Sequence, residues 1–376
     1  MLSPFLRPFS LMLKPAGPRC NLACRYCYYL DKQALYPDAA RALTMSDEVL
    51  EEAVHQYIEA QPTQEVVFVW HGGEPTLLPI SFYRKAMRLQ QRYAAGHLIS
   101  NCLQTNGTLL TPEWCQFLHD NEWLVGISID GNAVMHDAYR RTRGGGETHP
   151  LVLRGIGLLK QYDVQWNAMA VVNRLNADQP EAFYRYLKQI GCRYIQFAPI
   201  VEHTPDGAFT PESVLPEQWG EFCCRLFDEW LRCDDIGQVF VQLFDAVLAN
   251  WVGVTPGVCT LGVQCGHALA MEANGDVYSC DHFVDRAHLL CNVLDRTLAD
   301  MVEDARQRSF GSAKESALPD ECRACRWLSL CNGECPKNRL PSGRNYLCEG
   351  YRRFFAHSAP VMQQLRQEIL DRENGQ

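Results

Sequence analysis

Apolar residues follow two alternating patterns between residues 10 and 200. Short runs rich in β-branched and aromatic residues predict strands over 10–14, 66–70, 99–105, 124–129, 165–172 and 194–197. Longer segments repeat their apolar positions at helical spacing and predict helices over 46–59, 82–93, 112–119, 151–160 and 181–190. Ser46, Ser81 and Thr111 stand where N-caps belong. Strands that alternate with helices indicate repeated βα units around a parallel sheet.

Six βα units are fewer than the eight that close a full barrel. We therefore expect an α/β fold built on a partial, TIM-like (β/α)6 barrel. Helical spacing continues over 217–231 and 239–251, and 351–374 predicts a closing helix. The stretch 259–348 differs because it holds nine cysteines among Gly and Asn turns, which indicates a small domain that folds around its metal ligands. The expected domains are 1–235, 236–350 and a helical tail over 351–376.

Composition and charge exclude several classes of protein. Of the 376 residues, 47% are apolar and 21% are charged, which allows a sizeable core. The net charge of −9 gives no overall attraction to phosphate backbones or anionic lipid, so we expect neither nucleic acid nor a membrane as partner. No apolar run reaches the ~18 residues of a membrane span. Pro4, Arg7 and Pro8 interrupt the apolar start, so we expect no signal peptide.

Cysteine usage is the anomaly, with 18 residues in a chain too large to need stapling by disulfides. In a reducing cytoplasm, where we expect this protein, such cysteines are thiolate ligands. Cys20, Cys24 and Cys27 form a CxxxCxxC directly after the first predicted strand. Three thiolates leave one coordination position open, as in a catalytic rather than a structural centre. The alternatives are a zinc site that borrows a fourth ligand, or three unrelated thiols.

The segment CNLACRYC at 20–27, followed by HGGEP at 71–75, resembles the radical S-adenosylmethionine superfamily. The resemblance implies that the three cysteines hold a [4Fe-4S] cluster whose fourth iron is chelated by the methionine moiety of S-adenosyl-L-methionine. It also implies that Gly72, Gly73, Glu74 and Pro75 form the turn that contacts the amino group of that cofactor. Glycine lets a ligand approach the backbone closely because it lacks a Cβ.

Three further residues match cofactor contacts of that superfamily. Tyr26 corresponds to the aromatic residue at the adenine edge, and Ser128 and Asp130 follow the fourth predicted strand, near where the family holds the ribose and carboxylate. The alternatives are a packed aromatic side chain and an ordinary turn at the end of a strand.

The carboxyl-terminal cysteines reproduce the seven-cysteine pattern of the SPASM domain, and Cys259 precedes it. By that resemblance two auxiliary [4Fe-4S] clusters are fully ligated by protein, which implies electron transfer. The first auxiliary set is Cys259, Cys265, Cys280 and Cys335, and the second auxiliary set is Cys322, Cys325, Cys331 and Cys348. The alternative is a pair of zinc ribbons. The remaining cysteines are expected to be small apolar fillers: Cys102, Cys115, Cys192, Cys223, Cys224, Cys233 and Cys291.

Within this group, NCLQTNGTLLT at 101–111, LVGISIDG at 124–131 and GDVYSCDHF at 275–283 resemble the anaerobic sulfatase-maturating enzymes. That family implies oxidation of a cysteine or serine of a sulfatase, in a Cys/Ser-x-Pro/Ala-x-Arg motif, to Cα-formylglycine without oxygen. The family's reaction implies that an external reductant such as flavodoxin or ferredoxin supplies an electron, and that a 5′-deoxyadenosyl radical then removes a hydrogen from the Cβ of the target residue. Loss of a proton and a further electron gives an aldehyde from serine, or a thioaldehyde from cysteine that is hydrolysed to the aldehyde.

Asp281 matches the general base proposed for that family, although a carboxylate in this position also fits a turn. His71 stands where these maturases commonly have Gln, which we interpret as a tolerated polar exchange rather than a change of peptide preference. Two other functions stay open: a radical maturase that cross-links a ribosomal peptide, and a non-enzymatic iron–sulfur electron carrier or zinc-binding adaptor. We expect a monomer.

Overall fold

The computed structural model describes residues 7–36, 44–204 and 206–374. The expectation that no signal peptide is present rests partly on residues 1–6, which lie outside these ranges. The chain divides into two compact units. Unit 1 contains Met1–Ser128, Asp137–Trp166 and Gly266–Ser312, and unit 2 contains Ile129–His136, Asn167–Cys265 and Ala313–Gln376. The boundaries expected at residues 235 and 350 divide the chain differently and stay predictions.

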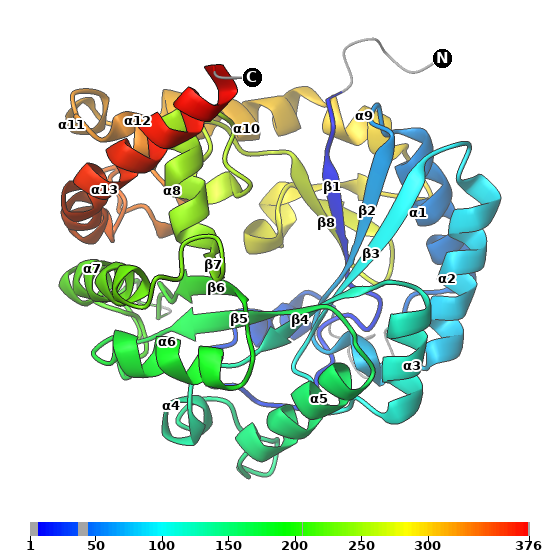
Figure 1. The fold of residues 1–376 in the computed structure, drawn as a ribbon. Helices are drawn as coiled ribbons and strands as arrows, with labels where there is room; N and C mark the ends of the chain where they lie inside the picture. The colour runs from blue at the N-terminus through cyan, green and yellow to red at the C-terminus, as the bar shows by residue number, and fades with distance from the viewer. Residues whose placement is uncertain (1–6, 37–43, 205, 375–376) are drawn as a thin grey trace. The chain divides into compact units, whose positions relative to one another are not determined.

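Unit 1 is organised around parallel strands in the order β8-β1-β2-β3-β4 (Figure 1). These strands are β1 (Ser10–Leu13), β2 (Glu65–Trp70), β3 (Leu98–Thr105), β4 (Leu124–Ser128) and β8 (Ala268–Met271). Beyond β8, the strands β9 (Asp276–Tyr278) and β10 (Leu289–Asn292) continue the sheet antiparallel. The carboxyl ends of parallel strands share one edge, so the loops after β1, β2 and β3 emerge together.

The helices of unit 1 bury one face each against a core rich in aromatic residues. Trp70 on β2 is fully buried, and Tyr83 and Trp123 lie 5.5 and 6.3 Å from it between ring centres. The helices and 3-10 turns of this unit are η1 (Leu30–Leu35), α1 (Asp47–Glu59), η2 (Pro75–Leu77), α2 (Ile80–Tyr93), α3 (Pro112–Asp120), α5 (His149–Gln161), η4 (Asp281–Phe283), η5 (Arg286–His288) and α9 (Leu298–Val302).

Two of the three predicted N-caps are confirmed. The hydroxyl of Ser46 accepts the N–H of Val49, and that of Thr111 accepts the N–H of Trp114. The prediction for Ser81 is wrong: α2 begins at Ile80 after Pro79, without a side-chain cap. A proline before the helix already holds extended backbone, which starts the helix two residues earlier than the apolar pattern indicates.

Unit 2 contains β5 (Trp166–Val172) from Asn167 onward, β6 (Tyr194–Pro199) and β7 (Phe240–Val241), which pair in parallel. The two-residue β7 was not predicted, because its residues were included in the helix over 239–251; helix α8 begins only at Gln242. The helices and turns of this unit are α6 (Pro180–Gln189), α7 (Pro216–Arg232), α8 (Gln242–Val252), η3 (Cys259–Leu261), α11 (Asp320–Arg323), α12 (Leu328–Cys331), η6 (Pro336–Asn338) and α13 (Cys348–Asn374). Helices α4 (Ala133–Asp137) and α10 (Ala305–Ser316) each have residues in both units.

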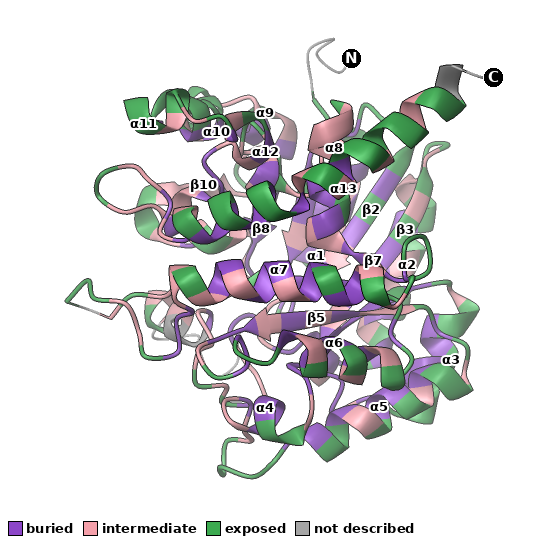
Figure 2. Ribbon diagram, turned by 60° about the vertical axis from the view of Figure 1, so that its left-hand side comes forward, coloured by how far each residue is buried: buried purple, intermediate pink, exposed green. Residues whose placement is uncertain are grey.

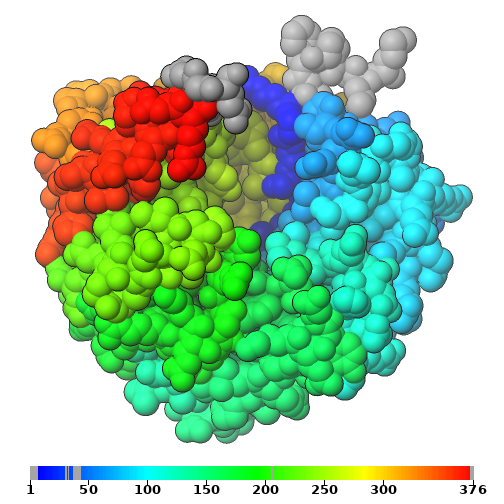
Figure 3. All heavy atoms as spheres, in the orientation of Figure 1, coloured from blue at the N-terminus to red at the C-terminus, as the bar shows by residue number. Residues whose placement is uncertain are grey.

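Helices α7 and α13 pack side by side, and Figure 3 shows their atoms in direct contact. Both helices alternate buried and exposed residues along their length, as Figure 2 shows for α7. They approach closely at two glycines: a Cβ built on Gly220 would lie 2.8 Å from the Cα of Gly350, and one on Gly350 would lie 2.4 Å from the carbonyl oxygen of Pro216. This crossing fixes the start of α13, where Cys348 lies.

We predict that Gly350→Ala lowers the free energy of unfolding by ~1–3 kcal/mol, because the added methyl group has no room between the helices. The measurement is urea unfolding of purified protein. Gly157→Ala in α5 is the matched control, since a Cβ there meets nothing within 4 Å and alanine favours a helix over glycine. Equal stability of the Gly350→Ala variant and the wild type would contradict the close-packed crossing.

Candidate active site

The amino-terminal cysteine loop follows β1 and gathers three thiols. The N–H of Leu22 donates to the sulfur of Cys20 at 3.4 Å. Burial, the Glu74 carboxylate and the thiols of Cys24 and Cys27 raise the pKa of Cys20 to about 12. Cys20 therefore lies within electrostatic reach of the other two thiols, and as thiolates they would repel it. A metal centre that binds here must displace their protons and would neutralise that repulsion.

The spacing of the thiols bears on the kind of centre. Across the parts of the chain that the structure describes, no three His, Cys, Asp or Glu side chains close around a single point as the ligands of one metal ion do. A polynuclear cluster needs its ligands farther apart, because its own irons and sulfides fill the space between them. Thiolates are the ligands that hold iron–sulfur clusters, so the chemistry of this donor set fits such a cluster.

The GGEP turn lies directly behind the cysteine loop. The N–H of Gly73 donates to the carbonyl of Gly17 at 2.9 Å, and the N–H of Glu74 donates to that of Arg19 at 2.8 Å. A Cβ on Gly73 would lie 2.0 Å from the oxygen of Arg19, and Gly72 has a φ of +117°. Glycine was predicted here because it lets a ligand approach the backbone. The structure gives a different reason: the backbone of the GGEP turn packs directly on the backbone of residues 17–19.

Glu74 is buried and ties the turn to the end of β3. Its Oε1 accepts from the N–H and hydroxyl of Thr76 and from the hydroxyl of Thr105, and its Oε2 accepts the N–H of Asn106 at 2.8 Å. Burial raises the pKa of Glu74, and these donors counter that rise. Pro75 opens η2, and its carbonyl accepts the hydroxyl of Tyr83. Contact of these residues with a ligand stays a prediction.

The three residues predicted to lie near the adenine, ribose and carboxylate of the cofactor have different surroundings. The half-buried ring of Tyr26 lies edge-on to Tyr139, and the guanidinium of Arg140 lies 5.4 Å from its centre. The hydroxyl of Ser128 accepts from the side-chain amide of Gln104 at 3.2 Å. Asp130 is fully buried, and its Oδ1 accepts the N–H of Val171, as a structural turn would require. Their predicted roles toward a ligand remain untested.

Asp281 belongs to a buried network of charges and phenols in unit 1. The Lys14 ammonium contacts its Oδ1, and the hydroxyl of Tyr28 donates to its Oδ2 at 2.5 Å. The same ammonium lies 3.6 Å from Oε1 of Glu272, which also accepts the hydroxyl of Tyr29. Burial opposes ionisation, but Lys14 outweighs it and lowers the pKa of Asp281 well below its ordinary value. Asp281 is thus a carboxylate held in one orientation.

His71 lies within electrostatic reach of this network and is uncharged at neutral pH. Burial lowers its pKa to about 4. Its Nδ1 accepts the N–H of Gly72 at 2.7 Å, which assigns the ring proton to Nε2. A neutral ring with one N–H donor can replace the amide of a Gln at this position, as the interpretation of a tolerated exchange requires, although the effect on peptide preference stays a prediction.

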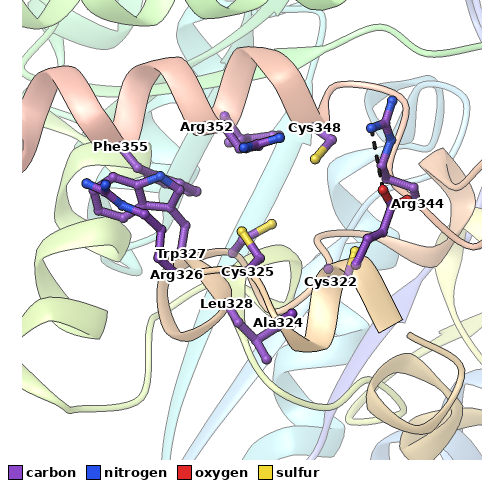
Figure 4. A pocket seen from close by; sticks show the side chains of 14 residues that line it. Cys322, Ala324, Cys325, Arg326, Trp327, Leu328, Arg344, Cys348, Arg352 and Phe355 are labelled. Atoms are coloured by element: carbon purple, nitrogen blue, oxygen red, sulfur yellow. Dashed lines mark ion pairs between the residues drawn. The ribbon is translucent and has the colours of Figure 1, made fainter. Parts of the chain in front are cut away.

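The second auxiliary set surrounds a cavity of about 460 Å³ in unit 2. Cys322, Cys325, Cys331 and Cys348 all line it, and Figure 4 shows the sulfurs of Cys322, Cys325 and Cys348 directed into the space between them. Four thiols around one space fit a fully protein-ligated cluster. Figure 4 also shows Arg352 of α13 beside this space.

The first auxiliary set is divided between the units. Cys259, Cys265 and Cys335 belong to unit 2, and the thiol of Cys259 interacts electrostatically with that of Cys265. Cys280 belongs to unit 1 and directly precedes η4, which begins with Asp281. The assignment of these four residues to one cluster stays a prediction.

Sequence reasoning missed four residues of the Asp281 network: Lys14, Tyr28, Tyr29 and Glu272. One signal was present for Lys14, because a lysine that ends an otherwise apolar strand must find a buried partner. Tyr28 and Tyr29 directly follow the third cysteine of the loop. Nothing in the sequence pairs Glu272 with Lys14, since 258 positions separate them and only the pairing of β8 with β1 brings them together.

Two family models match this chain. The radical SAM superfamily matches residues 15–187, which include the cysteine loop and the GGEP turn, and an iron-sulfur cluster-binding domain matches residues 263–326. Fold and site therefore define a radical SAM protein with a SPASM domain.

Closer relatives narrow this class. The chain is 50% identical to a serine-type anaerobic sulfatase-maturating enzyme of Bacteroides thetaiotaomicron over 99% of its own length and 94% of that protein. It is 32% identical to a cysteine-type enzyme of Clostridium perfringens over 94% and 97% of the two chains. This chain belongs to the family of the anaerobic sulfatase-maturating enzymes.

A solved structure agrees with this assignment. Native anSMEcpe with bound AdoMet and Cp18Cys peptide superposes with a TM-score of 0.86 at 31% identity, covering 96% of this chain and 100% of that one. The predicted α/β fold with a partial barrel and a SPASM domain is thereby confirmed. None of the helices in the described ranges is both long and apolar enough to cross a membrane.

We predict that Gly73→Ala lowers the free energy of unfolding by ~1–3 kcal/mol, since the new Cβ must push away the backbone of Arg19. The displaced loop carries Cys20, so the variant should also bind less iron per chain after anaerobic reconstitution. Urea unfolding and iron analysis measure both effects. The control is Gly144→Ala, where a Cβ would reach only the hydroxyl of Thr142, at 4.0 Å. A Gly73→Ala variant indistinguishable from that control would rule out the proposed packing.

Proposed function

We propose that this protein oxidises an active-site serine or cysteine of a sulfatase to Cα-formylglycine in the absence of oxygen. The observation that carries the proposal is the oriented carboxylate of Asp281, which shares unit 1 with the cysteine loop after β1 and the GGEP turn after β2. The high identity to a serine-type enzyme supports serine as the preferred target.

We further propose three [4Fe-4S] clusters and S-adenosyl-L-methionine as cofactors. Cys20, Cys24 and Cys27 would hold the cluster that binds S-adenosyl-L-methionine, with the GGEP turn beside it. The two auxiliary sets of cysteines would hold the others. When bound, the cofactor and its cluster supply a 5′-deoxyadenosyl radical that can remove a hydrogen atom from a Cβ.

Asp281 is proposed to accept the proton of the target hydroxyl or thiol. The ammonium of Lys14 keeps the carboxylate ionised, so it is ready to accept a proton at neutral pH. The same ion pair makes Asp281 a weak base. Proton transfer to a weak base becomes favourable when the substrate carbon is already a radical and loses its electron in the same event. Tyr28 fixes the orientation of the carboxylate during this transfer.

The partners follow from the same chemistry. We propose a sulfatase segment with a Cys/Ser-x-Pro/Ala-x-Arg motif as substrate and an external one-electron donor such as flavodoxin or ferredoxin. We also propose that the protein acts as a monomer in the cytoplasm, where a reducing environment keeps its many cysteines available as thiolates.

The test incubates anaerobically reconstituted protein with S-adenosyl-L-methionine, a reductant and peptides that carry either Ser-x-Pro-x-Arg or Cys-x-Pro-x-Arg. We predict 5′-deoxyadenosine together with an aldehyde on the peptide, detected by mass spectrometry. Asp281→Asn should form 5′-deoxyadenosine but at least ~100-fold less aldehyde, since a general base contributes 10²–10⁴-fold.

Two outcomes would contradict this account. 5′-Deoxyadenosine without an aldehyde on either peptide would favour the cross-linking alternative. Zinc in place of iron and sulfide would favour the zinc-binding adaptor and exclude radical chemistry in this protein.

A further inference from the structure

Lys314 on α10 is a fully buried cation beside the first auxiliary set of cysteines. Its Nζ donates to three backbone carbonyls, those of Cys259 at 2.6 Å, Thr260 at 2.8 Å and Gly262 at 2.5 Å. An ammonium group has three N–H donors and no acceptor. The three acceptors therefore match the charged form of this side chain, and its charge is fixed in place.

The ammonium of Lys314 lies within electrostatic reach of several thiols but forms no close ion pair with a carboxylate among the residues that the structure describes. It interacts electrostatically with the thiols of Cys265, Cys259 and Cys335 and with the carboxylate of Glu334. Within the described ranges, no carboxylate lies at ion-pair distance from it, in contrast to Lys337, whose Nζ pairs with Glu202. The backbone of Lys314 is held as well, because Arg339 donates to its carbonyl oxygen at 2.7 Å.

A buried carboxylate, that of Glu334, lies within electrostatic reach of Lys314 and of two of the same thiols, and Lys314 counters the rise in its pKa that burial causes. Glu334 is 2% exposed and directly precedes Cys335. Its carboxylate accepts from the side-chain amides of Asn338 and Asn345. Asn332, Gly333 and Glu334 all have positive φ, at 48°, 71° and 51°. Non-glycine residues rarely adopt this conformation, so the loop is constrained in the shape that carries Glu334.

We propose that Lys314 is a positioning residue for the auxiliary cluster that Cys259, Cys265 and Cys335 of unit 2 would help to hold. Lys314 fixes the loop of Cys259 and raises the reduction potential of that cluster, and Glu334 lowers the same potential. The inference rests on the proposed cluster assignment. Each electron that reaches the centre adds one negative charge, which a fixed cation stabilises and a fixed anion destabilises. Burial leaves both charges poorly screened by water and salt, so their effects on the cluster are large.

The chemical consequence concerns the second electron of the proposed reaction. That electron leaves the substrate radical as the proton moves to Asp281, and it must be accepted by an oxidant within the protein. A cluster with a raised potential is a better acceptor, so Lys314 would favour this step. Electrons balance because the cluster is reduced once for each substrate oxidised and returns its electron to an external carrier.

The experiment measures the midpoint potentials of the auxiliary clusters by titration monitored with electron paramagnetic resonance. A background with Cys20→Ala, Cys24→Ala and Cys27→Ala removes the amino-terminal cluster and leaves two, with about eight irons and eight sulfides per chain. In this background Lys314→Met should lower one potential by at least ~59 mV, a tenfold change in the equilibrium constant for a one-electron reduction. Lys314→Arg should restore most of the difference.

Two further variants separate charge from structure. Glu334→Gln should shift the same potential upward, opposite in sign to Lys314→Met, and it should also raise the potential of the second auxiliary cluster, because Glu334 interacts electrostatically with Cys331. Lys337→Met is the matched control, since its ammonium is neutralised by Glu202, and it should leave both potentials within error. If the role of Lys314 is purely structural, Lys314→Met should lose iron, and Glu334→Gln should show no upward shift of the reduction potential.

The outcomes are decisive in either direction. Unchanged potentials in Lys314→Met with both clusters retained would overturn the inference. If Lys314→Met loses its cluster, the test is the midpoint potential of Glu334→Gln. An upward shift of that potential supports the inference, and no shift overturns it. A background protein that binds zinc instead of iron and sulfide would refute the proposed function itself, which is a different result.

Discussion

The contact between the GGEP turn and the backbone that leads into the cysteine loop is the constraint on which the rest of this site depends. Parallel pairing of β1 with β2 brings the two loops to one edge of the sheet. Hydrogen bonds from Gly73 and Glu74 to Gly17 and Arg19 then join them, and only glycine fits at the closest point. Glu74 extends the connection to β3. Three loops that are distant in sequence thus become one rigid support for the thiols.

Two fully buried lysines are the second feature on which the proposed chemistry depends. Lys14 is fully buried between the carboxylates of Asp281 and Glu272, and Lys314 is fully buried among carbonyls and thiols. Burying a cation is costly unless it is paired or hydrogen-bonded, so both positions indicate a purpose beyond stability. In the first case the cation orients and ionises a proton acceptor. In the second it lies within electrostatic reach of thiols that are proposed to hold a cluster, which gains negative charge when it is reduced.

Much of the fold could be predicted from the sequence, because strands such as 66–70 and helices such as 46–59 carry clear local periodicity. The errors arose where local pattern was not decisive. β7 is too short to show a period, and Pro79 moved the start of α2 away from Ser81. The pairing of β8 with β1 is a long-range contact, so no window of sequence could reveal that the cysteine-rich stretch adds strands to the sheet of unit 1.

The residues of the candidate site also fall into two groups, those that could be predicted from the sequence and those that could not. The motif cysteines were predicted from their short, specific spacings, and the GGEP turn and Asp281 from the resemblance of their segments to known families. Lys14 and Glu272 were not, because their role arises only from packing. The reason for Gly73 was also incomplete, since the sequence indicated room for a ligand and the structure shows the backbone of Arg19.

The central claim is that Cys20, Cys24 and Cys27 hold an incompletely ligated iron–sulfur cluster that binds S-adenosyl-L-methionine. The most direct measurement is the electron paramagnetic resonance spectrum of the reduced protein before and after addition of that compound. The account predicts a changed signal for one cluster, and no change when the three cysteines are replaced by alanine. An identical spectrum with and without the compound, in protein with its full complement of iron and sulfide, would contradict it.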